Sequence, residues 1–242
     1  MIAKWTETMT VQSDAVDYKS NIRWSSLLNI LQRAADGHIE ALGVSREQMV
    51  EQGMGWMLIT LEVQMTSLPR YTDTIEIATW SRGSKGALWH RDYRLYNAEH
   101  EEIGAASSVW ALVDIHKRKI MRPSAFPYPV PVHEESVGIS LDKAIIPEGS
   151  KLEDVYVHTV RYSGLDSNGH LNNARYADLC WDTLTEEELE HKHVTRFKIT
   201  YHHEARRNDE MMLRRSQGEG TEVYIQGVSP KGTNFFEAAI IE

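Results

Sequence analysis

Cysteine is almost absent from this chain of 242 residues. Its single cysteine, Cys180, excludes an internal disulfide framework and a metal site of the CxxC type. A chain without disulfides suits a reducing compartment. No apolar run is long enough for the core of a signal peptide or for a membrane span. These absences predict a cytoplasmic protein that does not enter a membrane.

Positive charge is also scarce. The chain has 26 lysines and arginines against 35 aspartates and glutamates, and this net charge of −9 argues against a nucleic-acid-binding protein. The basic residues are nevertheless grouped, at 116–122, 206–207 and 214–215. Such groups are usually solvated surface, but together they also suit electrostatic steering of an acidic partner.

The common catalytic motifs are missing as well. The chain contains no HExxH, GxSxG, GxGxxG or P-loop sequence. Histidines are dense at 190–194 and 201–203, but alternation along a strand would point His202 and His203 to opposite faces. We therefore expect no metal and no cofactor.

Hydrophobic periodicity predicts an α+β fold. From Trp24 to Leu42, apolar residues follow the spacing of one helical face, and a shorter helical stretch follows near 45–53. Four segments rich in β-branched and aromatic residues come next, separated by turn-forming sequences. Their ranges are 56–65, 74–81, 88–97 and 103–115. A helix followed by such strands indicates an antiparallel sheet packed on a helix.

The same order of elements occurs twice. A second helical pattern covers 172–190, with Cys180 on its apolar stripe, and four further strand segments follow it. Aligning 17–28 with 166–177 pairs Asp17 with Asp166. Aligning 68–77 with 204–213 pairs Arg70 with Arg206 and Asp73 with Asp209. The sequence therefore predicts two copies of one module that form a pseudo-dimer within the chain.

Proline marks the join between the copies. The segment 122–150 holds five of the seven prolines and has no sustained periodicity. We interpret it as a linker that packs on the protein along its way. The predicted domains are residues 1–121, the linker at 122–150, and residues 151–242.

A polar cluster distinguishes the second copy. It has Asn168, His170 and Glu204 where the first copy has Lys19, Asn21 and Leu68. If the segment before the second helix is extended, then Asp166, Asn168 and His170 project to one side of it. The start of that helix would stabilise a carbonyl oxygen that gains charge, and Glu204 is a candidate general base for water. Residues that serve only the fold would more easily survive in both copies.

Structural roles are the competing interpretation. Helix capping is the commonest task of Asp and Asn at such positions, and we assign it to Asn172 and Asn173. For Asp166, Asn168 and His170 together it is less satisfactory, because one helix end needs one cap. We interpret His38, on the apolar stripe of the first helix, and Cys180 as core residues.

At these residues the sequence resembles the acyl-acyl-carrier-protein thioesterases. The resemblance is carried by DSNGHLNNARY at 166–176, which matches the family signature D-x-N-x-H-x-N-N-x-x-Y. YHHEAR at 201–206 matches the Y-x-x-E segment, and weaker similarity reaches into the first copy. Plant members have a cysteine directly after the glutamate, where this chain has Ala205. A carboxylate must therefore either activate water or attack the thioester directly, and Glu204 and Asp166 both remain candidates for this role.

The resemblance implies a double hotdog fold and hydrolysis of the thioester that joins a fatty acyl chain to the phosphopantetheine arm of acyl carrier protein. It places the catalytic residues on Asp166, Asn168, His170 and Glu204, in the second hotdog. It places the acyl chain in the first hotdog, between helix and sheet. Candidate lining residues there are Trp24, Leu28, Met54, Trp56 and Met57.

Two other functions stay open at this point. A hotdog hydratase or dehydratase would use Asp and His to move a proton and water across a double bond, and it can work without Glu204. A protein that binds acyl groups or carrier protein without catalysis would release no fatty acid. The sequence fixes neither the chain length nor the oligomeric state, and a homodimer is compatible with it.

Overall fold

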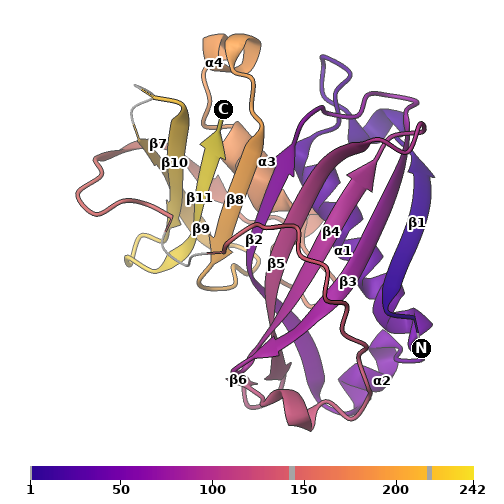
Figure 1. The fold of residues 1–242 in the computed structure, drawn as a ribbon. Helices are drawn as coiled ribbons and strands as arrows, with labels where there is room; N and C mark the ends of the chain where they lie inside the picture. The colour runs from indigo at the N-terminus through magenta and orange to yellow at the C-terminus, as the bar shows by residue number, and fades with distance from the viewer. Residues whose placement is uncertain (1, 142–144, 217–219) are drawn as a thin grey trace. The chain divides into compact units, whose positions relative to one another are not determined.

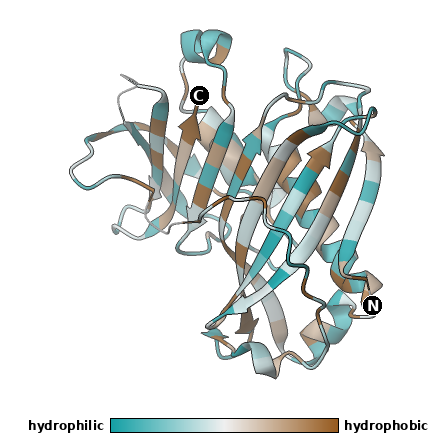
Figure 2. Ribbon diagram, viewed as in Figure 1, coloured by the Kyte–Doolittle hydropathy of each residue, from teal (hydrophilic) through white to brown (hydrophobic). Residues whose placement is uncertain are grey.

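The computed structural model describes residues 2–141, 145–216 and 220–242. The chain divides into two compact units, Met1–Leu141 and Asp142–Glu242. Each unit combines an antiparallel sheet with two helices (Figure 1). Hydrophobic and hydrophilic residues alternate along many strands of both units (Figure 2). This alternation is typical of sheets with one face in a core.

The N-terminal unit wraps a five-stranded antiparallel sheet around one long helix. The strands run in the order β1-β3-β4-β5-β2, and the short β6 pairs with β5. The elements are β1 (Lys4–Thr10), η1 (Ser13–Ala15), α1 (Trp24–Ala41), α2 (Arg46–Glu51), β2 (Met54–Met65), β3 (Thr74–Lys85), β4 (Leu88–Tyr96), β5 (Glu102–Asp114), β6 (Lys119–Ile120) and η2 (Pro123–Ala125).

Helix α1 forms the centre of this unit, as its periodicity predicts. Leu27, Leu31 and Ala34 recur on one face and are at most 1% exposed. Truncating one of these leucines to alanine costs about 2–5 kcal/mol. His38, on the same face, is fully buried and has a hydrogen-bonding contact at each ring nitrogen, so its interpretation as a core residue is confirmed. Among the described residues, no helix has the length and apolarity needed to cross a membrane.

The C-terminal unit repeats this plan. Its strands run in the order β7-β9-β10-β11-β8, which is the N-terminal order with each strand replaced by its counterpart. The elements are β7 (Leu152–Thr159), η3 (Tyr162–Gly164), α3 (Arg175–Trp181), α4 (Glu186–His191), β8 (Arg196–Tyr201), β9 (Glu210–Ser216), β10 (Glu222–Val228) and β11 (Asn234–Ile241). The predicted duplication is confirmed.

Each unit also opens with a strand that the sequence analysis missed. Strand β1 pairs with β3, and β7 pairs with β9, so both lie at the outer edge of their unit's sheet. Both contain several exposed positions. An edge strand with little buried surface carries a weak hydrophobic pattern, which explains why neither was predicted.

The single helix predicted over 172–190 is wrong, because the structure has two short helices there. Helix α3 ends at Trp181, and the Thr183 hydroxyl donates to the carbonyl of Cys180 at 2.7 Å. A new helix then begins at Glu186, after the N-cap residue Thr185, whose side chain forms a capping box with Glu188. The apolar stripe ends at Leu184, and the second helix has no buried residue.

The proline-rich segment lies against the N-terminal unit. Val132 bridges to Ser81 of β3, and the Trp80 indole donates to the carbonyl of Glu135 at 2.8 Å. The Glu135 carboxylate accepts from Arg94 at 2.7 Å and from Lys4 at 3.2 Å. These contacts fix residues 132–135 on the sheet. Residues 142–144 of the predicted linker lie outside the described residues.

Candidate active site

A tight turn at residues 165–171 carries three of the four predicted catalytic residues. Leu165 bridges to Leu171, and Gly169 has the left-handed φ of 78° that this turn requires. The Asp166 carboxylate Oδ1 accepts from the backbone N–H of Asn168 at 2.8 Å and of His170 at 3.1 Å. The expected extended segment is therefore wrong. The Asp166 carboxylate faces the backbone of its own turn.

The N-terminal unit builds the same turn without the polar cluster. The Asp17 carboxylate accepts from the backbone N–H of Lys19 at 2.9 Å and of Asn21 at 3.0 Å. Asp17 N–H donates to the Asn21 carbonyl at 2.8 Å, and Asp166 N–H donates to the His170 carbonyl at 2.7 Å. An aspartate with the same contacts in both units organises the turn. Asp166 therefore positions Asn168 and His170.

His170 and Glu204 lie side by side in the C-terminal unit. The His170 Nε2 atom is 3.4 Å from the Glu204 Oε2 atom, and the two side chains are 26% and 32% exposed. Glu204 Oε1 accepts from Arg206 Nη2 at 2.8 Å. The arrangement joins an imidazole, a carboxylate and a guanidinium in a partly shielded place. A carboxylate held this way can take a proton from water.

Backbone contacts bring the two segments of the site together. Leu171 N–H donates to the Ala205 carbonyl at 2.8 Å, and His170 bridges to Arg206. The segment between β8 and β9 is itself held by Asp209, whose carboxylate accepts from Arg206 N–H at 2.7 Å.

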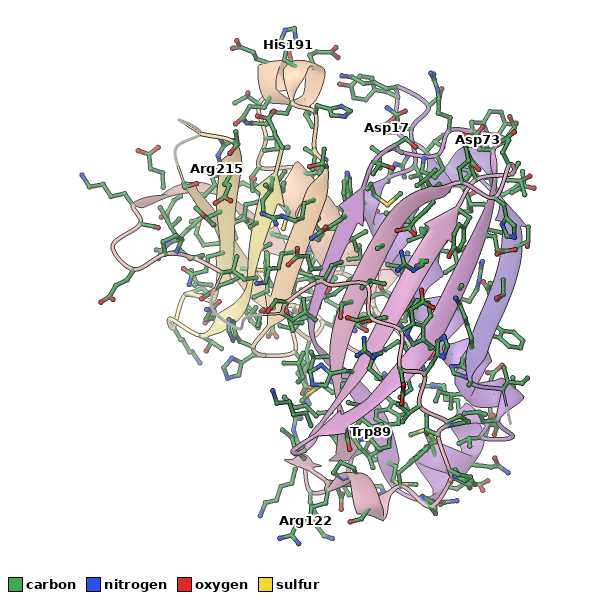
Figure 3. All side chains as sticks on the ribbon, in the orientation of Figure 1. Asp17, Asp73, Trp89, Arg122, His191 and Arg215 are labelled. Atoms are coloured by element: carbon green, nitrogen blue, oxygen red, sulfur yellow. The ribbon has the colours of Figure 1, made fainter. Side chains whose placement is uncertain are left out.

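The N-terminal unit repeats these contacts. Ile22 donates to the Pro69 carbonyl at 2.8 Å, and Asp73 holds Arg70 N–H at 2.8 Å. Asp17 and Asp73 lie at the same end of that unit (Figure 3). Leu68 occupies the place of Glu204 in the sequence alignment, so the backbone frame is shared and the carboxylate is not.

The remaining asparagines have different surroundings. Asn168 is exposed, and its Nδ2 atom lies 3.5 Å from Asp166 Oδ2. Asn172 accepts from Ala174 N–H at 2.9 Å, so it caps the turn that leads into α3. The Asn173 carbonyl accepts from the Tyr201 hydroxyl at 2.8 Å. Helix α3 begins only at Arg175, after an N-cap without a side-chain hydrogen bond. The predicted helix start at Asn172 is thus three residues too early.

Arg206 is the site residue that the sequence analysis did not assign. In the sequence it belongs to the basic pair at 206–207 and aligns with Arg70 of the first copy, and its spacing of two from Glu204 is the signal for a role in the site. Cys180 is fully buried, as predicted for a core residue, and burial raises the pKa of its thiol well above the ordinary value. In the described parts of the chain, no three His, Cys, Asp or Glu side chains form a group that could hold a metal.

A pocket lies within the N-terminal unit and encloses, with the adjoining open solvent, about 440 Å³ of space. Its lining includes Trp56, Trp89 and Trp110 from the sheet and Ile39 from α1. Of the five residues expected to line an acyl slot, Trp56 is part of this lining.

The other four candidates are placed differently. Trp24 and Leu28 are buried core residues on α1. Met54 packs in a core cluster with Val44 and Met49, and Trp56 packs against that cluster. Met57 is 40% exposed, because neighbouring residues of a strand point to opposite faces. Met57 therefore does not share the face of Trp56.

The three basic groups differ in exposure and pairing. Arg215 forms a bidentate contact with Glu188, with both distances 2.6 Å, and is only 13% exposed. Arg214 pairs with Asp154 at 2.6 Å. The group at 116–122 is exposed over most of its length, and Arg122 projects from the lower end of the N-terminal unit (Figure 3). The pair at 206–207 is exposed as well, and its Arg206 contacts Glu204.

Two family models match the chain. The model for the acyl-ACP thioesterase N-terminal domain matches residues 3–124, and the model for the C-terminal domain matches residues 150–238.

Curated relatives and solved structures agree with these models. A chloroplastic acyl-acyl-carrier-protein hydrolase of Cuphea viscosissima is 24% identical over 84% of this chain and 52% of its own length. An oleoyl-acyl carrier protein thioesterase of Arabidopsis thaliana is 24% identical over 85% of this chain and 60% of its own length. The chain thus spans about half the length of the curated relatives that it matches.

An acyl-ACP thioesterase structure from Bacteroides thetaiotaomicron covers 99% of this chain and 97% of its own, with 21% identity and a TM-score of 0.87. A 12:0-ACP thioesterase from Umbellularia californica covers 100% and 97%, with 18% identity and a TM-score of 0.81. Together with the repeated sheet order, these likenesses confirm the predicted double hotdog fold.

Proposed function

Because the chain belongs to the acyl-acyl-carrier-protein thioesterase family, we propose that it hydrolyses fatty acyl thioesters of acyl carrier protein and releases the free fatty acid. The contact that carries this proposal is the 3.4 Å approach of His170 to Glu204. The N-terminal unit has Asn21 at the position of His170 and Leu68 at the position of Glu204, and these two residues cannot form an imidazole–carboxylate pair.

Glu204 is the base in this mechanism. Its carboxylate removes a proton from water while the water oxygen bonds to the thioester carbon. The carbonyl electron pair moves to oxygen, where the Asn168 amide and the His170 imidazole are the nearby donors. When the carbonyl re-forms, the carbon–sulfur bond breaks, and the sulfur takes the proton from Glu204. The products are one carboxylic acid and one thiol.

Asp166 is a positioning residue in this mechanism. One of its oxygens already accepts two backbone N–H groups, and Asp17 makes the same contacts where the cluster is missing. Glu204 instead points at His170 and is held by Arg206. These contacts favour Glu204 over Asp166 as the group that meets water.

We assign the acyl chain to the pocket of the N-terminal unit and the chemistry to residues 151–242, with 122–150 as the connecting segment. The exposed basic group at 116–122 is a suitable contact for an acidic carrier protein. The single buried cysteine is compatible with a reducing cytoplasm.

The test is Glu204→Gln, assayed with acyl-acyl-carrier-protein and acyl-coenzyme A thioesters. Loss of general-base help should reduce the release of free thiol by at least about tenfold. Glu210→Gln, which changes an exposed glutamate of the same unit, is the matched control and should keep full activity.

Two other outcomes would overturn the proposal. A hydrated or dehydrated acyl thioester as the product would indicate a hydratase or dehydratase. Binding of the carrier thioester with no release of fatty acid by the unmodified protein would indicate a non-catalytic binding protein.

A further inference from the structure

The pocket of the N-terminal unit is lined by more hydrogen-bond donors than a slot for plain hydrocarbon needs. Three indole rings line it, from Trp56, Trp89 and Trp110 on strands β2, β4 and β5. Trp56 and Trp89 meet edge to face, with ring centroids 5.5 Å apart. Trp89 lies toward the end of the unit opposite to the Asp17 turn (Figure 3). We refer to this cavity as the tryptophan pocket.

The three indoles differ in their hydrogen bonds. The Trp110 N–H donates to the Ser108 hydroxyl at 2.7 Å. The Nε1 atoms of Trp56 and Trp89 are buried, and neither has a hydrogen-bond partner among the described residues. Buried indole N–H groups usually find an acceptor. Trp5 Nε1 is also buried without a partner, but only Trp56 and Trp89 line this pocket, where a bound chain can supply the acceptor.

A buried arginine adds to this set of donors. Arg91 lines the same pocket and is 6% exposed. Its Nη1 atom lies 3.0 Å from His38 Nδ1 and donates to the Thr79 hydroxyl at 3.0 Å. Because a guanidinium only donates, His38 Nδ1 accepts, and Nε2 donates to the Ile2 carbonyl at 2.9 Å.

Both hydrogen-bond partners of the Arg91 guanidinium, His38 and Thr79, are therefore neutral. Within the described residues, no carboxylate forms an ion pair with it at 4.0 Å or less. A buried guanidinium is ordinarily paired with an anion or with several acceptors. Asp36 also lines the pocket, so the lining is not purely cationic. A neutral oxygen suits this mixture better than a carboxylate does.

We propose that the tryptophan pocket selects acyl chains that carry an oxo or hydroxyl group, which accepts hydrogen bonds from the indole N–H groups of Trp56 and Trp89 beside Arg91. This inference rests on the proposed function, since it names the substrate class of the same acyl site. A hydrocarbon chain would leave both indole donors unpaired. Sites built to bond a substrate hydroxyl discriminate strongly against analogues that lack it.

The experiment compares matched acyl thioesters from short to long, with and without an oxo or hydroxyl group near the carboxyl end, in the middle or at the far end. At one position of the oxygen, kcat/KM should exceed that of the plain chain by at least about tenfold. Trp56→Phe and Trp89→Phe keep an aromatic ring but remove the indole N–H together with part of the ring. Each should lower this ratio by about two- to tenfold.

Trp110→Phe is the matched control. It removes an indole from the same pocket, but the N–H of this indole already donates to Ser108. It should leave the ratio unchanged. An equal fall in all three variants would mean that ring size governs selectivity, and this would overturn the proposal. Equal kcat/KM for plain and oxygenated chains in the unmodified protein would overturn it as well.

Calorimetric binding of the corresponding free acids separates this inference from the proposed function. If the protein hydrolyses no thioester but binds the oxygenated acid more tightly, and Trp56→Phe removes that preference, then the proposed function fails and the pocket assignment holds. If it hydrolyses thioesters without any such preference, the pocket assignment fails alone.

Discussion

The turn at residues 17–22 of the N-terminal unit and the turn at residues 166–171 of the C-terminal unit share their hydrogen bonds but not their side chains. In each, an aspartate accepts from the N–H groups two and four residues later. In each, the backbone is tied to the segment that leads into a later strand. Only the second turn presents an imidazole, which meets the carboxylate of Glu204.

This difference separates two kinds of polar residue that look alike in the sequence. Asp17 and Asp166, like Asp73 and Asp209, satisfy backbone N–H groups and belong to the fold. The side chains of His170 and Glu204 instead face each other, with His170 Nε2 3.4 Å from Glu204 Oε2. A residue present in both copies therefore indicates architecture, and one confined to a single copy indicates chemistry.

The largest difference should be between alanine substitutions at His170 and at Asn21, which occupy equivalent positions in the two turns. His170→Ala should lower the rate of thioester hydrolysis by at least about a hundredfold, because a donor beside the reacting carbonyl is removed. Asn21→Ala, at the equivalent position of the first turn, should leave the rate unchanged. The release of free thiol measures both. Equal losses would show that the first turn also takes part in the reaction.

The second helix of each unit allows a stability comparison. Helices α2 and α4 both begin with a capping box, built by Ser45 with Gln48 and by Thr185 with Glu188. Glu188 also binds Arg215, and this hydrogen bonding lowers its pKa to about 2. Glu188→Gln makes the second box resemble the first. It should reduce the free energy of unfolding near neutral pH by about 2–3 kcal/mol.

The pH dependence of this effect follows from the direction of the pKa shift. The stabilisation is fully present above the ordinary glutamate pKa of 4.5 and disappears as the pH falls through about 2. Urea unfolding at several pH values measures it. Asp154→Asn, which removes the exposed partner of Arg214, is the control and should change the free energy of unfolding by less than about 1 kcal/mol. A matching loss in both variants would contradict a special role for Glu188.

The smallest expected difference is between the free energies of unfolding of the variants Asp17→Ala and Asp166→Ala. Asp17→Ala and Asp166→Ala should each reduce the free energy of unfolding by about 1–2 kcal/mol, because each leaves two N–H groups without their acceptor. Urea unfolding followed by circular dichroism measures both. Only Asp166→Ala should also slow hydrolysis. Full stability together with lost activity in Asp166→Ala would instead assign the carboxylate a chemical role.

Much of the fold was predictable, because long amphipathic and β-rich segments leave clear periodicities. Helix α1 and the strands from β2 to β5 start within two residues of their predicted limits. The edge strands β1 and β7 were not predicted, since exposed residues dilute their pattern. The break between α3 and α4 was missed although the capping signature of Thr185 and Glu188 is present in the sequence.

The candidate site was predictable in composition and only partly in geometry. The restriction of His170 and Glu204 to the second copy, together with the family resemblance, predicted one cluster, and the structure brings these two side chains together. The direction of the Asp166 carboxylate depends on a turn with Gly169 at positive φ, which the assumption of an extended segment overlooked. The meeting of His170 with the segment of Glu204 and Arg206 includes the bridge from His170 to Arg206, a contact between distant segments that no local pattern predicts.

The tryptophan pocket was the least predictable feature. Trp56, Trp89 and Trp110 lie on three strands, and none shares a short motif with another. Which indole N–H finds an acceptor depends on the placement of one serine, Ser108. Such a difference is a property of packing, and it has no counterpart in periodicity or composition.

The two aspartate turns share the same backbone hydrogen bonds and one carboxylate each, although the residues at positions 19 and 21 differ from those at 168 and 170. Folding and reactivity are consequently inherited separately in this protein. After duplication, one copy can lose or acquire reactive groups while both keep the same turn.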